Sequence, residues 1–159
     1  MSIDDILSAL QDTPVAQAVA DSAWIFPTTE SIHVAAITLV VGAVALVDLR
    51  LIGVASTGRS VRELETQYLP ITWAAFAVGA ITGAVMFLAK PTSYAHNPFF
   101  LAKLVLLGLA AVNMLVFHFV VEPRQTAGRG GQAARVSGAV SLAIWIGVIA
   151  VGRWIGFVI

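Results

Sequence analysis

The sequence predicts an all-α integral membrane protein built around a bundle of four transmembrane helices. Hydrophobic residues make up 58% of the 159 residues, charged residues make up 11%, and the mean hydropathy is +0.89. A soluble domain carries roughly 25% charged residues. Four apolar stretches also reach or approach the roughly 20 residues that cross about 30 Å of hydrocarbon. Frequent Gly and Ala within them are typical of membrane helices.

Residues 1–26 are expected to form two short amphipathic helices at the membrane surface. Ser2 and Asp5 have the spacing of a capping box, and Thr13-Pro14 is typical of a helix start. The apolar residues at helical spacing are Ile3, Ile6, Leu7 and Leu10. Such a stripe could lie on the outer leaflet, anchored by Trp24, or dock on a partner protein.

Residues 27–159 are predicted to form the four-helix domain. We place its helices at about 28–50, 70–90, 99–121 and 137–157. The connection over 122–136 is polar and rich in Gly, which indicates a flexible connector.

Small residues recur at four-residue spacing on the second and fourth predicted helices. They are the pairs Gly79/Gly83, Ser137/Ser141, Ala143/Gly147 and Gly152/Gly156. Such faces let helix backbones approach closely. They predict tight packing inside the bundle or a homo-oligomer formed through one of these faces.

Arginine placement predicts the orientation in the membrane. The first and third connections and their flanks hold Arg50, Arg59, Arg62, Arg124, Arg129 and Arg135. The N-terminal segment has no Lys or Arg, and the second connection with its flanks offers only Lys90 and Lys103. Because positive residues concentrate on the cytoplasmic side, both termini are expected on the outer side.

Several functional classes lack support in the sequence. There is no cysteine, which excludes disulfides, thiolate metal sites, iron–sulfur clusters and covalently attached c-type haem. The net charge is zero and the basic residues are dispersed, so a nucleic-acid partner is not expected. No phosphate loop, nucleophile elbow or HExxH motif is present, and we assign no catalytic residue. The acidic start MSIDDILSAL argues against a cleavable signal peptide.

Ionisable residues inside a membrane are costly unless paired, so they are candidates for function. On the predicted topology, an outer layer contains Glu30, His33, Met86, Lys90, His96, Lys103 and Arg153. His33, with His96 or Met86 at similar depth, could hold a b-type haem, and the same three residues could hold copper. Lys90, Lys103 and Arg153 would suit haem propionates or another anionic ligand.

A second, inner layer contains Asp48 and His118 at matched depth, with Asn113 about a turn and a half deeper. Asp48 and His118 predict a hydrogen-bonded pair, which could be a proton relay or a polar clamp between two helices. Glu30, three residues before His33, could form a similar pair in the outer layer. A single haem between His33 and His118 is excluded, because helical rise separates them by about 15–20 Å along the membrane normal.

Three runs of sequence resemble a family of small bacterial four-helix inner-membrane proteins of unknown function. They are Trp24 followed by PTTESIHVAAITLVVGAVALVDLRLIG, then LPITWAAFAVGAITG, then NPFFLAKLVLLGLAAVNMLVFH. The resemblance covers most of residues 24–118 and implies a location in the bacterial inner membrane, without implying an activity. Its motif positions are Glu30, His33, Asp48, Arg50, Asn97, Pro98, Lys103, Asn113 and His118. A looser similarity links the chain to copper-resistance and b-type cytochrome membrane proteins.

The leading functional prediction is an inner-membrane subunit that holds a b-type haem, or another redox metal, in the outer half of the bundle for electron transfer. Two alternatives stay open. One is a structural or accessory subunit that binds a membrane or periplasmic protein partner. The other is a proton-coupled carrier, which with four short helices would require an oligomer. Membrane lipid surrounds the protein in each case.

Overall fold

The computed structural model describes residues 2–55, 58–126 and 131–158, and these residues contain helices and no strand. Four segments are long and apolar enough to cross a membrane. They are α3 (Ile25–Ile52), α4 (Val61–Ala89), α6 (Pro98–Val116) with its continuation to Arg124, and α8 (Gly131–Val158). The all-α, four-helix membrane fold is therefore confirmed.

Two short helices precede the bundle, and both begin at the predicted caps. In α1 (Ile3–Gln11), the Ser2 backbone N–H donates to Asp5 Oδ2 at 2.6 Å and the Asp5 N–H donates to Ser2 Oγ at 3.2 Å. Hydrogen bonds from the Ser2 backbone N–H and from the Ser2 hydroxyl to the Asp5 carboxylate hold the pKa of Asp5 below its usual value. In α2 (Pro14–Asp21), Thr13 Oγ1 accepts the Ala16 N–H at 3.3 Å.

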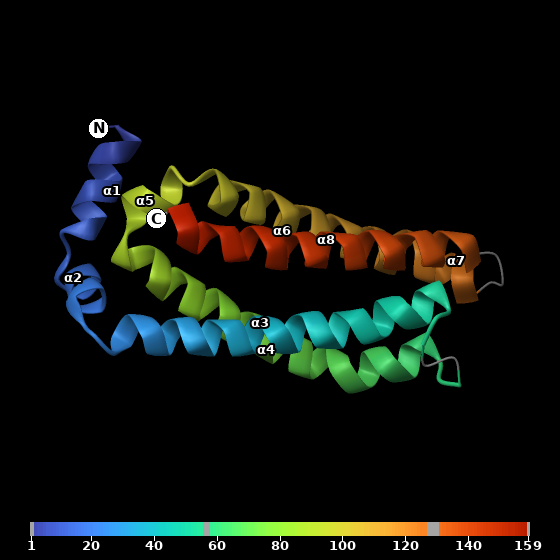
Figure 1. The fold of residues 1–159 in the computed structure, drawn as a ribbon. Coiled ribbons are helices and arrows are strands. Elements are labelled where there is room, and N and C mark those ends of the chain that lie inside the picture. The colour runs from blue at the N-terminus through green and yellow to red at the C-terminus, as the bar shows by residue number, and fades with distance from the viewer. Residues whose placement is uncertain (1, 56–57, 127–130, 159) are drawn as a thin grey trace.

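Both termini lie at the same end of the bundle, together with α1, α2 and α5 (Pro91–Ala95) (Figure 1). Helix α1 packs on α5, while α2 packs on α4 and α3. The apolar stripe of α1 is divided between two environments: Leu7 is buried, whereas Ile3 and Ile6 are exposed. One part of the stripe therefore attaches α1 to the bundle and the other part faces outward.

Helix α4 begins at Val61, nine residues before the expected start at 70. Ser60 and Glu63 form a second capping box, with the Ser60 N–H donating to Glu63 Oε2 at 2.8 Å. This cap satisfies N–H groups at the helix start, which lets the polar segment before Pro70 join the apolar helix. The extension places Glu65 and Tyr68 on α4.

The third membrane segment contains a short π-helix, η1 (Phe117–Val121), followed by α7 (Glu122–Thr126). The Glu122 N–H bonds to the Phe117 carbonyl five residues back. Pro123 follows directly, and its ring would clash with the carbonyl four residues before it in a regular α-helix. The wider turn of η1 relieves this clash. His118 lies within this turn.

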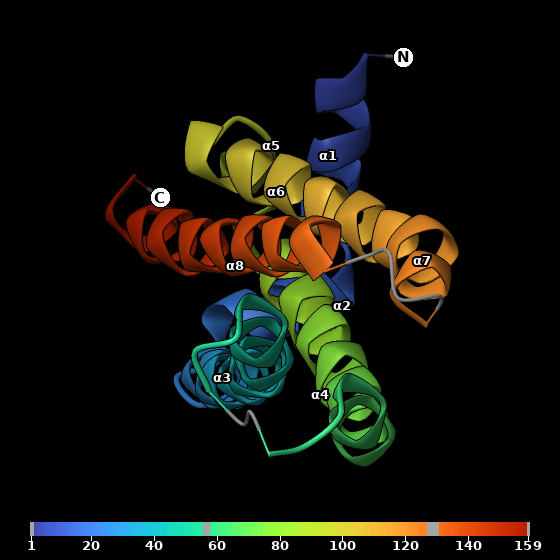
Figure 2. The same ribbon diagram turned by 90° about the vertical axis from the view of Figure 1, so that its right-hand side faces the viewer.

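The bundle consists of two helix pairs, α3 with α4 and α6 with α8, joined where α3 packs on α8 (Figure 2). A Cβ built on Gly79 would lie 3.2 Å from Ile37 Cδ1, and one built on Gly83 would lie 3.2 Å from His33 Cε1. The predicted small-residue face of α4 is thus used for close packing within the chain. By contrast, no Cα atoms of α4 and α6 come within 8 Å of each other.

Candidate ligand-binding cavity

A cavity of about 330 Å³ lies between α4 and α6, and α3 and α8 form its floor. Its wall is mainly apolar and includes the rings of Tyr68, Trp73, Phe76, Phe117 and Trp145. The polar residues in the wall are Asp48, Glu65, Thr72, Asn113, His118, Ser137 and Ser141. A largely apolar cavity of roughly 300–1000 Å³ with a few polar groups is typical of small-molecule sites.

Asp48 is the most buried ionisable residue of this wall. Its exposed fraction is 4%, and its Oδ2 atom has no hydrogen-bond partner among the residues that the structure describes. The Ser141 hydroxyl is within hydrogen-bonding reach of the carboxyl group. A carboxylate buried in a membrane costs several kcal/mol unless a partner compensates its charge. Asp48 therefore holds a buried, unsatisfied acceptor in the wall of the cavity.

His118 bonds to its own helix neighbour instead of Asp48. Its Nδ1 atom lies 2.8 Å from Glu122 Oε2, one helical turn further along the chain. No hydrogen bond or ion pair joins His118 to Asp48 in the described ranges, although both residues line the same cavity. Glu65 of α4 lies close enough to His118 and Glu122 to interact with them electrostatically. These three side chains lie at the Arg-rich end of the bundle.

Asn113 links two helices. Its Nδ2 donates to the Ser137 carbonyl at 3.2 Å, and its Oδ1 accepts from the Ser137 hydroxyl at 3.3 Å. Both polar atoms of the amide are therefore used between α6 and α8. This geometry is that of a structural hydrogen-bonded pair, and the Asn113 amide does not connect Asp48 to His118.

In the half of the bundle nearer the termini, His33 ties three helices together. Its Nδ1 lies 2.9 Å from the Gly79 carbonyl and 3.0 Å from Thr82 Oγ1. A carbonyl only accepts, so Nδ1 carries the ring proton. The remaining nitrogen, Nε2, accepts from Lys103 Nζ at 3.4 Å. An iron or copper ion on Nε2 would have to displace Lys103.

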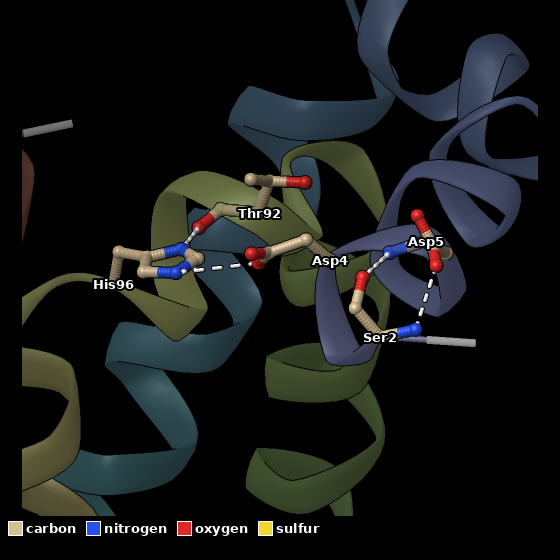
Figure 3. Close-up of polar contacts among 5 residues, drawn as sticks. All are labelled: Ser2, Asp4, Asp5, Thr92 and His96. Atoms are coloured by element: carbon tan, nitrogen blue, oxygen red, sulfur yellow. Dashed lines mark hydrogen bonds and ion pairs between the residues drawn. The ribbon is translucent and has the colours of Figure 1, made fainter.

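His96 lies on the outer surface (Figure 3). Its Nδ1 faces the Thr92 carbonyl at 2.9 Å, and its Nε2 faces Asp4 Oδ1 of α1 at 3.3 Å. Both ring nitrogens thus face oxygen acceptors. The described residues contain no group of three or more His, Cys, Asp or Glu side chains placed to hold a metal ion.

The remaining predicted outer residues take separate positions. Lys90 is exposed, and the Arg153 guanidinium stacks over Phe157 at 4.7 Å. Met86 is partly buried on α4. Glu30 is exposed and, within the described residues, forms no hydrogen bond or ion pair with His33. Together with burial, its charge raises the pKa of Tyr94. Of the three predicted basic residues, Lys103 alone reaches His33.

Comparison with known proteins gives one match. Residues 20–158 match DUF6644, a family of unknown function. The chain belongs to this family. No curated protein and no solved structure matches it. The resemblance to a family of small membrane proteins of unknown function is therefore confirmed, and membership of DUF6644 brings no activity with it.

Several residues around the cavity of this DUF6644 chain were not predicted. Glu65 lies before the expected start of its helix, and Glu122 lies just after the expected end of its own. The four-residue spacing of His118 and Glu122 is a signal that could have found their contact. Ser141 was predicted only as part of a small-residue face, and no periodicity within α8 indicates that it faces Asp48.

Proposed function

We propose that this protein binds a lipophilic molecule carrying an ammonium group in the cavity between α4 and α6, with Asp48 as the anchor. The observation that supports this proposal is the unpartnered Oδ2 of a carboxyl group that is 4% exposed in an apolar wall. An ammonium group can neutralise that carboxylate and donate a charge-assisted hydrogen bond to it.

The other wall residues fit the same class of ligand. Tyr68, Trp73 and Trp145 offer aromatic faces to the cavity, and such faces attract cations as well as apolar groups. The Asp48 charge disfavours an anionic ligand. A cavity of about 330 Å³ is near the lower end of the usual range for small molecules, so we expect a compact apolar amine rather than a long-chain lipid.

Asp48 can hold either a proton or an ammonium ion, so binding should release a proton. This exchange supports the proton-coupled carrier among the predicted classes. Glu65 and His118 line the cavity at its Arg-rich end, and Glu122 bonds to His118 there. We propose that this end faces the cytoplasm and that both termini lie on the outer side of a bacterial inner membrane.

Binding of three compounds that share one rigid apolar body tests the proposal. Adamantylmethylamine, adamantylmethanol and adamantane carboxylate are cationic, neutral and anionic at neutral pH. We expect detergent-purified protein to bind the amine most tightly and the carboxylate least. Binding is measured by the change in fluorescence of Trp73 and Trp145, which line the cavity. Equal affinity for the three compounds would contradict the proposal.

A b-type haem or another redox metal on His33 is a second proposal. It is favoured by one observation: the Nε2 atom contacts a side-chain ammonium and no backbone group, so a ligand could replace Lys103 there. A reduced-minus-oxidised visible spectrum of protein from haem-replete cells tests it. Absence of a haem band would exclude a bound haem.

A structural subunit that binds a protein partner is a third proposal. It is supported by the exposed apolar residues Ile3, Ile6 and Val15 on the terminal helices. This class predicts that His33→Ala lowers stability without loss of a cofactor.

A further inference from the structure

Lys103 places an ammonium group inside the membrane segment without an acidic partner. It lies five residues after Pro98, roughly 8 Å along α6 from the helix start. Its Nζ contacts His33 Nε2 at 3.4 Å, and in the described part of the chain no carboxylate forms an ion pair with it. The two other outer basic residues differ, because Lys90 is exposed and Arg153 stacks on Phe157.

His33 cannot neutralise this charge. Its proton is on Nδ1, where it donates to the Gly79 carbonyl, so Nε2 offers one neutral lone pair to Lys103. An ammonium has three N–H donors, and two stay available for a ligand. Because an unpaired charge in a membrane is costly, an anion that accepts these two donors would stabilise the outer half of the bundle.

The surroundings of Lys103 indicate what kind of anion could reach it. Phe100, one turn before Lys103, stacks with Phe87 at 5.7 Å and meets Tyr94 at 5.4 Å between ring centroids. These rings form an aromatic cluster one turn from Lys103, on the side of the termini. Leu101 and Leu104 are about half exposed on another face of α6, and in a membrane they face acyl chains. Lys103 is itself only partly buried, so an anionic head group could reach it while the apolar part of the same molecule stays in the lipid around α6.

We propose that Lys103, oriented by His33, binds the anionic oxygen head group of an amphipathic molecule, a phosphate or a carboxylate, in the outer half of the membrane. The phosphate of an anionic phospholipid and the carboxylate of a fatty acid share this chemistry. This site is separate from the Asp48 cavity and has the opposite charge preference. Its failure or success is therefore independent of the proposed amine binding at Asp48.

The test measures retention of phosphatidylglycerol and phosphatidylcholine by native mass spectrometry, with laurate and inorganic phosphate as further probes. We expect wild-type protein and Lys103→Arg to retain phosphatidylglycerol in preference to phosphatidylcholine. Lys103→Gln should bind it roughly tenfold more weakly, since a hydrogen bond to a charged group is lost. Lys90→Gln is the matched control, because Lys90 is an exposed lysine at the same end, and it should behave as wild type. Asp48→Asn should do the same.

The probes also distinguish the sources of the anion. Preference for laurate over phosphatidylglycerol would assign the site to a fatty-acid carboxylate, and stabilisation by inorganic phosphate alone would assign it to a water-soluble anion. The first outcome supports the proposal, and the second would overturn binding of an amphipathic molecule. Equal phosphatidylglycerol retention by wild type and Lys103→Gln would overturn the proposal, and so would an equal loss in Lys90→Gln. Lys103→Arg keeps the charge and serves as the folded reference if Lys103→Gln is poorly stable.

Discussion

Gly138 of α8 lies directly against the backbone of Asp48 in α3. A Cβ built on Gly138 would be 3.0 Å from the Asp48 carbonyl oxygen and 2.9 Å from Leu51 Cβ. A close approach between the two helix pairs therefore occurs at Asp48, a residue that lines the cavity. Close packing fixes the backbone there, and the position of the Asp48 carboxyl depends on it.

Gly138→Ala should destabilise the protein by about 1–3 kcal/mol, because the added methyl group meets backbone that cannot move freely. Thermal unfolding in detergent measures the change. Gly152→Ala on the same helix is the control, since a Cβ at Gly152 meets nothing within 4 Å. An equal effect of the two substitutions on stability would show that the close approach at Gly138 does not contribute to the free energy of unfolding.

Asn113 and Ser137 should show measurable coupling between α6 and α8. Polar pairs between membrane helices contribute on average about 0.6 kcal/mol, and up to about 1.7. Asn113 and Ser137 exchange two hydrogen bonds, although the one to the Ser137 carbonyl survives Ser137→Ala. A double-mutant cycle with Asn113→Ala and Ser137→Ala should therefore give coupling within this range. Strictly additive losses of unfolding free energy would mean that the hydrogen bond between the Asn113 and Ser137 side chains contributes nothing to stability.

The absence of cysteine makes the orientation directly testable. Asp12 is exposed at the end that holds the termini, and Gly58 is exposed beyond α3 at the opposite end. With a membrane-impermeant maleimide, Asp12→Cys should react in spheroplasts, whereas Gly58→Cys should react only after the membrane is opened. The reverse pattern would place the termini in the cytoplasm.

The membrane fold follows from the sequence because apolar length and helix caps are local properties. The caps at Ser2 and Thr13 and the packing face at Gly79 and Gly83 were all predicted from spacing. The contacts of His118 were not, since depth along a helix does not decide which of several neighbours binds. Glu122 is one turn away on the same helix, and this local competitor takes the imidazole.

The cavity could not be predicted from the sequence either. It exists because α4 and α6 stay apart, and the separation of two helices is not encoded in the periodicity of either one. Likewise, the sequence placed Lys90, Lys103 and Arg153 in one group by depth. Tertiary structure separates them, because the direction of each side chain depends on the neighbouring helix.

Exchange of a cation for a proton at Asp48 should be visible in proteoliposomes. We expect the trimethylammonium derivative of adamantylmethylamine to drive proton movement reported by an internal pH dye. A quaternary cation suits this test because it cannot cross lipid as a neutral base. It has no N–H to donate, so it would replace the Asp48 proton by its charge alone. Asp48→Asn should abolish the signal, since an amide cannot exchange a proton near neutral pH. Asp12→Asn, at an exposed position, should retain the signal. Proton movement in Asp48→Asn equal to that in wild type would exclude the carrier.

The role of Asp48 as the anchor is tested most directly by its selectivity between adamantylmethylamine and adamantylmethanol. A charge-assisted hydrogen bond contributes about 1.5–3 kcal/mol, which corresponds to a preference for the amine of roughly tenfold to a hundredfold. We expect wild-type protein to show this preference and Asp48→Asn, which keeps the shape of the side chain, to bind both compounds equally. An Asp48→Asn protein that still prefers the amine as strongly as wild type would contradict the account.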